Sequence, residues 1–397
     1  MDAFKTHDDV ITNYKNYLKS FLNIQDQRIK EKVEDVFSTN TLIPDPLIQF
    51  NPSFEKSDTL QDLISEGILH QDLPTAVGNY QLFKHQIEAI RLGASNKGFI
   101  VTSGTGSGKS LTFLATIFNY IFNLGEEKKK GVKAILVYPM NALINSQEEE
   151  IKKYKINYLE NIVGVGRVIK ENKTLDEIIQ QLEALTTERF PVTFSKFTGQ
   201  ENNEKRDAIR SEIPDIILTN YMMLELIMTR VSEKWFRDSI KDNLQFLVYD
   251  ELHTYRGRQG ADVSYLNKRI QASCNVELLC IGTSATMASA GSPDDKKTEV
   301  AKVASILFGK PFDASQIVSE YLETCTAGKR FSQHELSGAV NSRVDQSWNE
   351  DEFKNHPVTN WLELNIALKD NHGTLERGTP LSVTEISIKL SAESAVH

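Results

Sequence analysis

Hydrophobic and polar positions follow two patterns along the chain. Between about residues 80 and 290, short apolar runs recur, and most of them are separated by segments with helical spacing. The runs are GFIVTS, AILVYP, VTFSKF, DIILT, QFLVY and VELLCIG. Short continuous apolar runs are typical of buried strands, and their alternation with helices predicts an α/β fold with a mainly parallel sheet.

The flanking segments are predicted to be mainly helical. Apolar residues recur at helical spacing over 10–37, which predicts two amphipathic helices. The stretch IPDPLIQFNPSF is expected to be extended and to precede a short helix that ends near Gly67. After residue 291 the strand signal fades, and polar helical segments around Trp348 and Trp361 lead to PLSVTEISIKL.

These patterns predict three parts. A helical N-terminal accessory region covers 1–75, and an α/β lobe covers 76–290 with a polar, helix-prone insertion near 156–190. A helical region over 291–397 is interpreted as the truncated start of a following domain. Ser382 and Glu385 have the spacing of a capping box, so a helix is expected to start there with little chain left to pack against.

Composition and charge narrow the class of protein. The chain has 397 residues, 40% of them hydrophobic and 25% charged, with no signal-like start and no apolar stretch near the roughly 18 residues that span a membrane. We therefore expect a cytoplasmic protein without a membrane partner. Three cysteines lack metal spacing, and the run EEKKK at 126–130 is interpreted as a solvated loop. The net charge of −9 disfavours a broad basic surface, but a groove can still bind phosphates through amides and hydroxyls.

The strongest chemical signal is SGTGSGKS, which lies between a predicted strand and a predicted helix. This is the context of a phosphate-binding loop, in which glycines turn backbone N–H groups toward phosphates at a helix N-terminus. Lys109 would reach the β- and γ-phosphates, and Ser110 would ligate Mg²⁺. Ser103 replaces the usual first glycine, a change expected to cost little because that position contributes least to the phosphate cradle. The residues expected to bind the nucleotide here are Ser103, Gly104, Thr105, Gly106, Ser107, Gly108, Lys109 and Ser110.

A second signal is LVYDELHTYRG, an apolar strand that ends in two carboxylates. Asp250 can hold Mg²⁺ and Glu251 can polarise an attacking water, which is what metal-assisted phosphoryl transfer needs. The alternative interpretation is a strand followed by a helix-capping acid. Both carboxylates are expected at the carboxyl edge of the sheet that carries the loop.

Together these motifs resemble superfamily 2 helicases, in which the first loop position is serine or alanine. Asp250, Glu251 and His253 belong to a segment that looks like their DExH box. Other segments resemble further family motifs in the expected order: LFKHQIEAI, YPMNALINSQ, FTGQ, LTNYMMLE and GTSATM. The resemblance implies a RecA-like P-loop NTPase lobe that uses ATP and Mg²⁺ and acts on nucleic acid, with DNA favoured over RNA.

The resemblance also implies roles for individual residues. Gln86 would read the adenine edge, and Phe83 or Tyr80 would stack on the ring, although Phe83 fits a core position equally well. With Lys109, Asp250 and Glu251, His253 would complete the catalytic set. It would also pass the nucleotide state to Ser284, Ala285 and Thr286. Nucleic-acid contacts are expected at Thr198, Gly199, Thr219 and Asn220, while Arg256 and Arg258 fit either solvated surface or phosphate contact.

A narrower resemblance is to YprA-type helicases and to helicase subunits of phage-defence systems such as DISARM, carried by YPMNAL and DELHTYRGRQGADV. No Q-x-x-G-R-x-G-R segment is found, so arginine fingers are expected from a second RecA-like lobe in the full-length chain or in a partner. We therefore expect the ATP-binding half of a helicase or translocase, in genome defence or DNA repair, with other defence-system subunits among its candidate partners. The alternative is a nucleotide-gated binding or scaffold module without translocation.

Overall fold

The computed structural model describes residues 3–38, 45–164, 173–285, 291–342, 347–371 and 373–395. Backbone contacts divide the chain into two compact units. The larger unit is Phe54–Leu322, and the smaller combines Met1–Ser53 with Glu323–His397. The strands β2 (Ser53–Phe54) and β12 (Leu322–Glu323) pair where the chain passes from one unit to the other.

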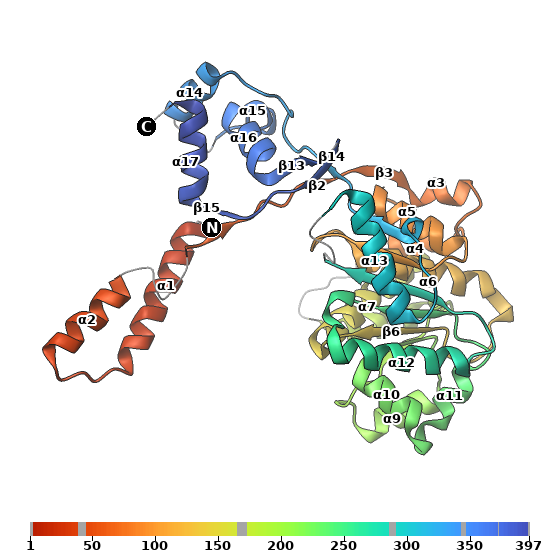
Figure 1. Ribbon diagram of the computed structural model, residues 1–397. Helices are drawn as coiled ribbons and strands as arrows, with labels where there is room; N and C mark the ends of the chain where they lie inside the picture. The colour runs from red at the N-terminus through yellow and green to blue at the C-terminus, as the bar shows by residue number, and fades with distance from the viewer. Residues whose placement is uncertain are drawn as a thin grey trace. The chain divides into compact units, whose positions relative to one another are not determined.

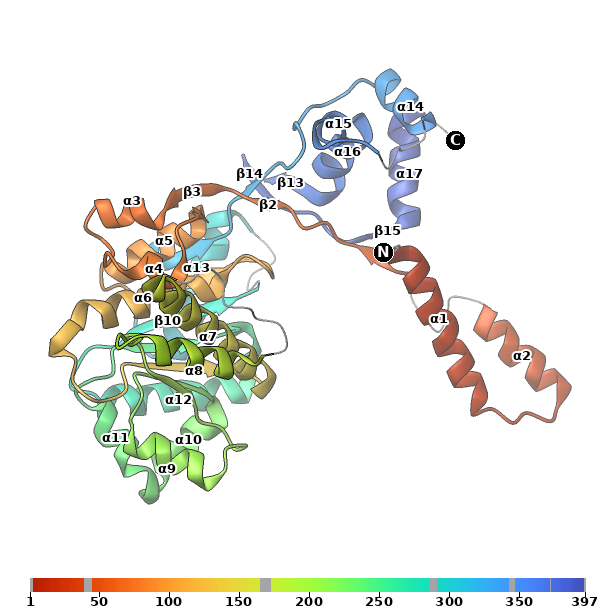
Figure 2. The same ribbon diagram turned by 180° about the vertical axis from the view of Figure 1, so that it is seen from behind.

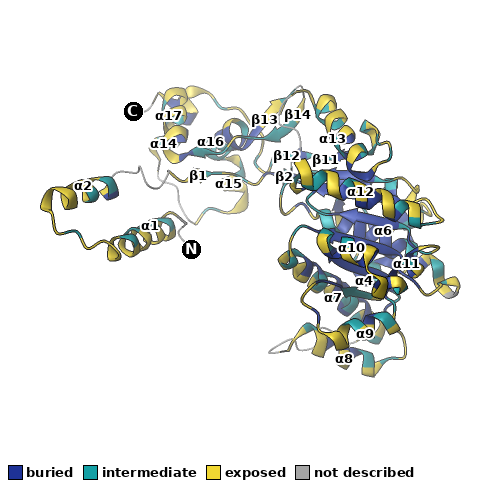
Figure 3. Ribbon diagram, turned by 60° about the horizontal axis from the view of Figure 1, so that its bottom comes forward, coloured by how far each residue is buried: buried dark blue, intermediate teal, exposed yellow. Residues whose placement is uncertain are grey.

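A seven-stranded parallel sheet forms the centre of the larger unit, in the order β11-β5-β10-β9-β6-β8-β7. Figure 3 shows the sheet as the buried part of this unit. Its strands are β5 (Phe99–Thr102), β6 (Ala134–Tyr138), β7 (Phe194–Lys196), β8 (Ile216–Asn220), β9 (Phe246–Tyr249), β10 (Leu279–Ser284) and β11 (Ile317–Ser319). The six apolar runs of the sequence coincide with six of these strands, so the predicted α/β fold with a parallel sheet is confirmed.

Both faces of the sheet are buried, which explains why its strands are continuously apolar rather than alternating. In β6, Leu136 faces one apolar cluster while Ile135 and Val137 face another. Figure 1 shows α12 and α13 over one face, and Figure 2 shows α7 and α8 over the other. One layer contains α5 (Lys84–Ala94), α6 (Lys109–Leu124), α7 (Asn141–Val163) and α8 (Leu175–Leu185), and the other contains α10 (Tyr221–Thr229), α11 (Lys234–Ile240), α12 (Gly257–Ser273) and α13 (Pro293–Phe308).

Shorter elements complete the larger unit. An antiparallel pair, β3 with β4, brings Lys56 opposite Phe83. The remaining elements are β3 (Lys56–Thr59), α3 (Leu60–Ser65), α4 (Leu73–Val77), β4 (Gln81–Phe83), η1 (Gly125–Glu127), α9 (Asn203–Ser211), η2 (Val231–Glu233), η3 (Leu252–Thr254) and η4 (Ala314–Gln316). Among the described residues, no helix combines the length and the apolar character needed to cross a bilayer.

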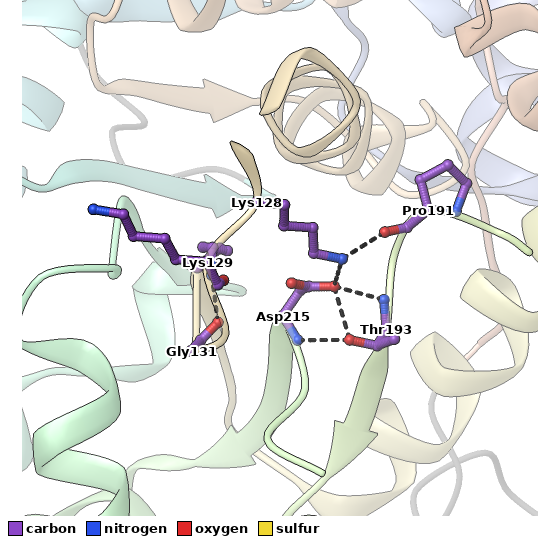
Figure 4. A network of polar contacts seen from close by, with 7 residues as sticks. Lys128, Lys129, Gly131, Pro191, Thr193 and Asp215 are labelled. Atoms are coloured by element: carbon purple, nitrogen blue, oxygen red, sulfur yellow. Dashed lines mark hydrogen bonds and ion pairs between the residues drawn. The ribbon is translucent and has the colours of Figure 1, made fainter. Parts of the chain in front are cut away.

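The amino ends of the sheet strands are tied together by a polar network (Figure 4). The Asp215 carboxylate accepts from Lys128 Nζ at 2.6 Å and from the backbone and hydroxyl of Thr193 at 2.8 and 2.7 Å. Lys128 also donates to the Pro191 carbonyl at 2.7 Å. The interpretation of 126–130 as a solvated loop is therefore wrong for Lys128, because its ammonium anchors the base of the sheet, away from the carboxyl edge.

The smaller unit has its own small core, made of Leu336, Trp361, Ile366 and Ile386. Its elements are α1 (Ala3–Ser20), α2 (Gln27–Ser38), β1 (Leu47–Ile48), α14 (Gln333–Asn341), α15 (Glu350–Asn355), α16 (Pro357–Leu362), η5 (Glu363–Ala367), β13 (Leu368–Asn371), β14 (Thr374–Arg377), β15 (Leu381–Ser382) and α17 (Val383–Ser394). Strand β1 pairs antiparallel with β15, so segments from both ends of the chain build this unit.

The predicted capping box is present, since Ser382 and Glu385 bond reciprocally at the start of α17. The expectation that this helix has little to pack against is wrong, because Ile386 is buried against Trp361 and Leu336. The sequence also gave no signal for β11, whose apolar part is only Ile317 and Val318. The larger unit therefore extends beyond the expected span of 76–290 on both sides, to Phe54 and Leu322.

Candidate nucleotide-binding active site

The phosphate loop connects β5 to α6 at the carboxyl edge of the sheet. Gly106 and Gly108 have φ angles of 78° and 70°, in the left-handed region that favours glycine. A Cβ on Gly108 would lie 2.3 Å from Gln86 Nε2. The side chain of Gln86 on α5 therefore packs so close to the loop that position 108 has no room for a side chain. A Cβ on Gly106 would meet nothing within 4 Å, so this part of the loop faces open space.

The serine at the first loop position closes the loop on itself. The Ser103 and Ser107 hydroxyl oxygens lie 2.6 Å apart, and both residues are 1% exposed. The Ser103 N–H donates to the Ser284 carbonyl at 3.1 Å, which joins the loop to the end of β10. Serine therefore contributes a buried hydrogen bond that glycine lacks.

Lys109, the first residue of α6, turns its ammonium toward the loop. Nζ donates to the Ser103 carbonyl at 2.9 Å and to the Gly104 carbonyl at 3.3 Å. These carbonyls hold the cation inside the loop, next to the amides that follow Gly104.

A cavity of about 630 Å³ opens over the loop. This volume is in the range of small-molecule sites, roughly 300–1,000 Å³. The predicted residues Phe83, Gln86, Asp250 and Glu251 line it together with the loop. The full lining is Lys56, Tyr80, Gln81, Phe83, Gln86, Thr105, Gly106, Ser107, Gly108, Lys109, Ser110, Leu111, Glu150, Tyr154, Asp250 and Glu251.

Asp250 follows β9 and is held by Thr283, a residue that the sequence analysis did not single out. Thr283 donates its hydroxyl to the Asp250 carboxylate and accepts from the Glu251 backbone N–H at 3.3 Å. Burial raises the pKa of Asp250, while the Thr283 hydrogen bond and the charge of Lys109 oppose that rise. Thr283 therefore favours the ionised carboxylate that a metal ion requires.

Glu251 adopts φ 52° and ψ 54°, a left-handed conformation that is uncommon for a non-glycine residue. Its Oε2 atom is buried and accepts no hydrogen bond, although it lies 3.2 Å from His253 Nδ1. The same histidine nitrogen lies 3.2 Å from Ser284 Oγ. From this turn Glu251 lines the cavity, and its Oε2 lies beside His253.

His253 thus contacts Ser284, the first of the three residues expected to couple the nucleotide site to nucleic acid. Ser284 ends β10 and Ala285 follows it, whereas Thr286 lies outside the described residues.

On the expected adenine side, Gln86 is buried and bonded to protein. Its Oε1 accepts from the Phe83 N–H at 3.0 Å, and its Nε2 donates to the Gly108 carbonyl at 3.2 Å. The amide therefore links the start of α5 to the phosphate loop. Tyr80 is 47% exposed at the cavity wall, while Phe83 stacks on His85 with ring centroids 5.7 Å apart.

His85 is a second residue that the sequence analysis passed over. It is fully buried, and its Nε2 lies 2.9 Å from the Ser107 carbonyl, which requires a proton on that nitrogen. Its Nδ1 has no hydrogen-bond partner, and burial lowers the pKa of the imidazole. A neutral His85 therefore supports the loop from below.

The four residues expected to contact nucleic acid lie after β7 and at the end of β8. Their environments differ. The Thr198 hydroxyl donates to Glu201 at 2.8 Å, and the Thr219 hydroxyl donates to the Phe197 carbonyl at 2.7 Å, so both are engaged inside the protein. Gly199 is exposed, and Asn220 caps α10 through Met223 N–H while its Nδ2 donates to Asn141 Oδ1 at 2.9 Å. The side chains of Arg256 and Arg258 are exposed.

Three features of the cavity fit ATP with a divalent metal ion. The space in front of Gly106 is open beside the start of α6, where backbone N–H groups and the helix dipole favour phosphate. Ser110 and Asp250 both line the cavity and offer the oxygen ligands that Mg²⁺ prefers. Glu251 lines the same cavity, and its Oε2 accepts no hydrogen bond from the protein.

A family model for the DEAD/DEAH box helicase matches residues 83–189 and 174–292, which together are more than half of the chain. The chain belongs to the DEAD/DEAH box helicase family. The matched residues include the phosphate loop, the DELH segment and β10.

Several proteins resemble this DEAD/DEAH box chain over more than half of its length. The Druantia protein DruE of Escherichia coli is 25% identical over 367 residues, 70% of this chain and 20% of its own length. An uncharacterized ATP-dependent helicase of Methanocaldococcus jannaschii, MJ1574, is 30% identical over 53% of this chain and 26% of its own. The uncharacterized ATP-dependent helicase YprA of Bacillus subtilis is 24% identical over 53% and 23%. The chain thus spans about a quarter or less of the length of these relatives.

Among solved structures, the DUF1998 helicase MrfA bound to DNA and AMPPNP resembles this helicase chain with a TM-score of 0.46 and 17% identity. The likeness covers 79% of this chain and 38% of MrfA.

Proposed function

We propose that this chain is the ATP-binding motor lobe of an ATP-dependent nucleic-acid helicase or translocase that acts on DNA. The observation that carries the proposal is one cavity lined both by the phosphate loop and by Asp250 and Glu251. A scaffold that only senses nucleotide has no need for the second carboxylate.

Each residue has a task in ATP hydrolysis that follows from its position. Lys109 would exchange the loop carbonyls for the phosphates of ATP and neutralise charge there. Ser110 and Asp250 would hold Mg²⁺, which when bound neutralises charge on the phosphates and helps to orient them. Glu251 would accept a hydrogen bond from the attacking water and orient it.

The result of hydrolysis would reach the nucleic acid through β10. His253 contacts both Glu251 and Ser284, so it would transmit a change in the hydrogen bonding of Glu251 to Ser284. Ser284 also accepts from the Ser103 N–H, which gives the loop a second connection to the same strand end. Asn220 and Gly199 would meet the sugar–phosphate backbone, a mode of binding that carries no sequence preference.

A second RecA-like lobe, in a longer chain or in a partner, would supply the arginine residues that stabilise charge on the γ-phosphate. We place the activity in genome defence or DNA repair. The similarity to the Druantia protein DruE and the resemblance of DELHTYRGRQGADV to helicase subunits of phage-defence systems support this assignment.

The test is nucleotide binding to the chain, followed by ATP hydrolysis with single- and double-stranded DNA and RNA in a preparation that contains the second lobe. Lys109→Ala should abolish ATP binding in calorimetry, because it removes the cation that the loop provides. Lys97→Ala, which removes an exposed lysine just before β5, is the matched control. Unchanged affinity in the Lys109 variant would refute the proposed site, and hydrolysis that no nucleic acid stimulates would favour the scaffold alternative.

A further inference from the structure

The carboxylate of Glu320 is hydrogen-bonded to the phosphate loop. Glu320 directly follows β11, the edge strand that pairs with β5, and its backbone N–H donates to the Thr102 carbonyl at 3.1 Å. The Glu320 Oε2 atom accepts from the Gly104 N–H at 2.8 Å. The strand register therefore delivers this carboxylate to the second residue of the loop.

An acidic side chain beside an anion-binding loop needs an explanation, since like charges repel. The cavity is lined by loop residues from Thr105 onward, and neither Gly104 nor Glu320 lines it. The carboxylate therefore contacts the loop at a residue that does not line the cavity. It occupies an N–H group that precedes the cavity-lining amides.

We infer that Glu320 is a positioning residue for nucleotide binding, which holds the beginning of the phosphate loop in place through the Gly104 N–H. This role rests on the proposed ATP site. It acts through the loop backbone, since the carboxylate does not line the cavity.

Gly104 makes a second contact through its carbonyl oxygen, and this contact explains why Glu320 matters most when nucleotide is bound. The Gly104 carbonyl accepts from Lys109 Nζ at 3.3 Å. When Lys109 turns to phosphate, that contact is given up, whereas the Glu320 contact on the N–H side is unaffected. Glu320 then holds Gly104 in place while Lys109 exchanges the loop carbonyls for phosphate.

The segment that carries Glu320 is anchored independently of the carboxylate. The Tyr321 hydroxyl donates to both oxygens of Glu88 at 2.8 and 2.9 Å, and Lys84 Nζ lies 4.4 Å from the Tyr321 ring centroid. The Tyr321 carbonyl accepts from the Glu55 N–H at 2.9 Å. Removing the Glu320 carboxylate should therefore release the Gly104 N–H while these contacts hold the segment in place.

The experiment compares Glu320→Ala, Glu320→Gln and the control Glu149→Ala, which removes an exposed carboxylate on α7, in the 397-residue chain. Hydrogen exchange of a peptide spanning residues 99–113 reports the Gly104 contact without nucleotide, and titration with a fluorescent ATP or ADP analogue in Mg²⁺ reports affinity. Glu320→Ala should speed hydrogen exchange at Gly104. It should also lower the affinity for both nucleotides by about tenfold, which is the effect of one lost hydrogen bond to a charged group. Glu320→Gln should stay close to wild type because its amide oxygen still accepts.

Glu149→Ala should leave exchange at Gly104 and nucleotide affinity unchanged, and the far-ultraviolet circular dichroism spectra of all three variants should match wild type, which shows that they fold. Wild-type exchange or affinity in Glu320→Ala would overturn the inference, as would a gain in affinity or equal losses in the alanine and glutamine variants. The two proposals fail separately. Faster exchange in Glu320→Ala, in a chain that binds no ATP, would refute the ATP site and leave the loop contact standing.

Discussion

The Thr283 hydroxyl is a donor to the Asp250 carboxylate, across two adjacent strands of the sheet. The same oxygen accepts from the Glu251 N–H at 3.3 Å. One side chain on β10 therefore fixes both acidic residues of the DELH segment. It also opposes the rise in the pKa of Asp250 that burial causes.

Replacing Thr283 by valine should weaken the Mg²⁺-dependent part of ATP binding. Without the hydroxyl, the pKa of Asp250 rises further, so the carboxylate loses its charge at a higher pH than in wild type. A hydrogen bond to a charged group contributes about 1.5–3 kcal/mol, so the loss should be about tenfold or more. Calorimetry with and without Mg²⁺, from pH 5 to 8, measures it.

Thr283→Ser keeps the hydroxyl and serves as the control for that series. The valine variant should lose affinity most strongly at the acidic end, while the serine variant follows wild type. If valine and wild type show the same Mg²⁺ dependence at every pH, Asp250 does not depend on Thr283.

Glu251→Gln should leave ATP affinity nearly unchanged and reduce turnover by at least about 10²-fold. The amide keeps the size of the side chain but cannot accept from and activate water as a carboxylate does. Hydrolysis is measured in a preparation that includes the second lobe. The control is Glu149→Gln, which makes the same substitution at an exposed position of α7. Normal turnover in the Glu251 variant would remove this residue from the catalytic set.

The motifs of the site could be predicted from sequence because each is local. The loop from Ser103 to Ser110 and the pair Asp250-Glu251 are short segments of consecutive residues. Strands that are buried on both faces can be recognised as continuous apolar runs. The same reasoning predicted six sheet strands. It failed for β11, where only Ile317 and Val318 are buried, too short a run to stand out.

The contacts that hold the motifs in place could not be predicted in the same way. Thr283 is 33 residues from Asp250, and Glu320 is 216 residues from Gly104. Only the strand order β11-β5-β10-β9 brings them together, and that order is not written in any local pattern. Thr283 had a weak sequence signal, because it is a polar residue at the end of an apolar run and the second residue of the motif GTSATM. Glu320 left none.

Nucleotide choice tests the role of Gln86. If its amide reads adenine, GTP should bind more weakly than ATP by ~1–3 kcal/mol, because guanine presents the opposite donor and acceptor pattern and leaves buried polar groups unpaired. Gln86 already accepts from Phe83 N–H and donates to the Gly108 carbonyl, so Gln86→Glu keeps the first bond and loses the second.

Competition between ATP and GTP for a fluorescent analogue, in wild type and in Gln86→Glu, separates the two roles of this side chain. If Gln86 recognises adenine, the Gln86→Glu variant should lose its preference for ATP over GTP, because the substitution removes the amide N–H donor. Equal affinity of wild type for ATP and GTP would mean that Gln86 only joins α5 to the loop.

His85 should make the larger unit less stable in mild acid. In the folded state burial lowers its pKa, with the nearby charge of Lys109 acting in the same direction and the Ser107 hydrogen bond and Glu320 acting against it. In the unfolded chain the imidazole takes up a proton below its ordinary pKa of about 6.5. The unfolded state therefore binds more protons as the pH falls through 6.5 toward the lower folded pKa, and stability is lost over that interval.

His85→Gln cannot titrate, and its amide can still donate to the Ser107 carbonyl. Its melting temperature should consequently fall less than that of wild type between pH 7.5 and 5.5, and each kcal/mol of difference should appear as roughly 2–4 °C. The exposed histidine substitution His334→Gln is the control and should follow wild type. Parallel melting curves for His85→Gln and wild type would show that this histidine is protonated alike in the folded and unfolded states.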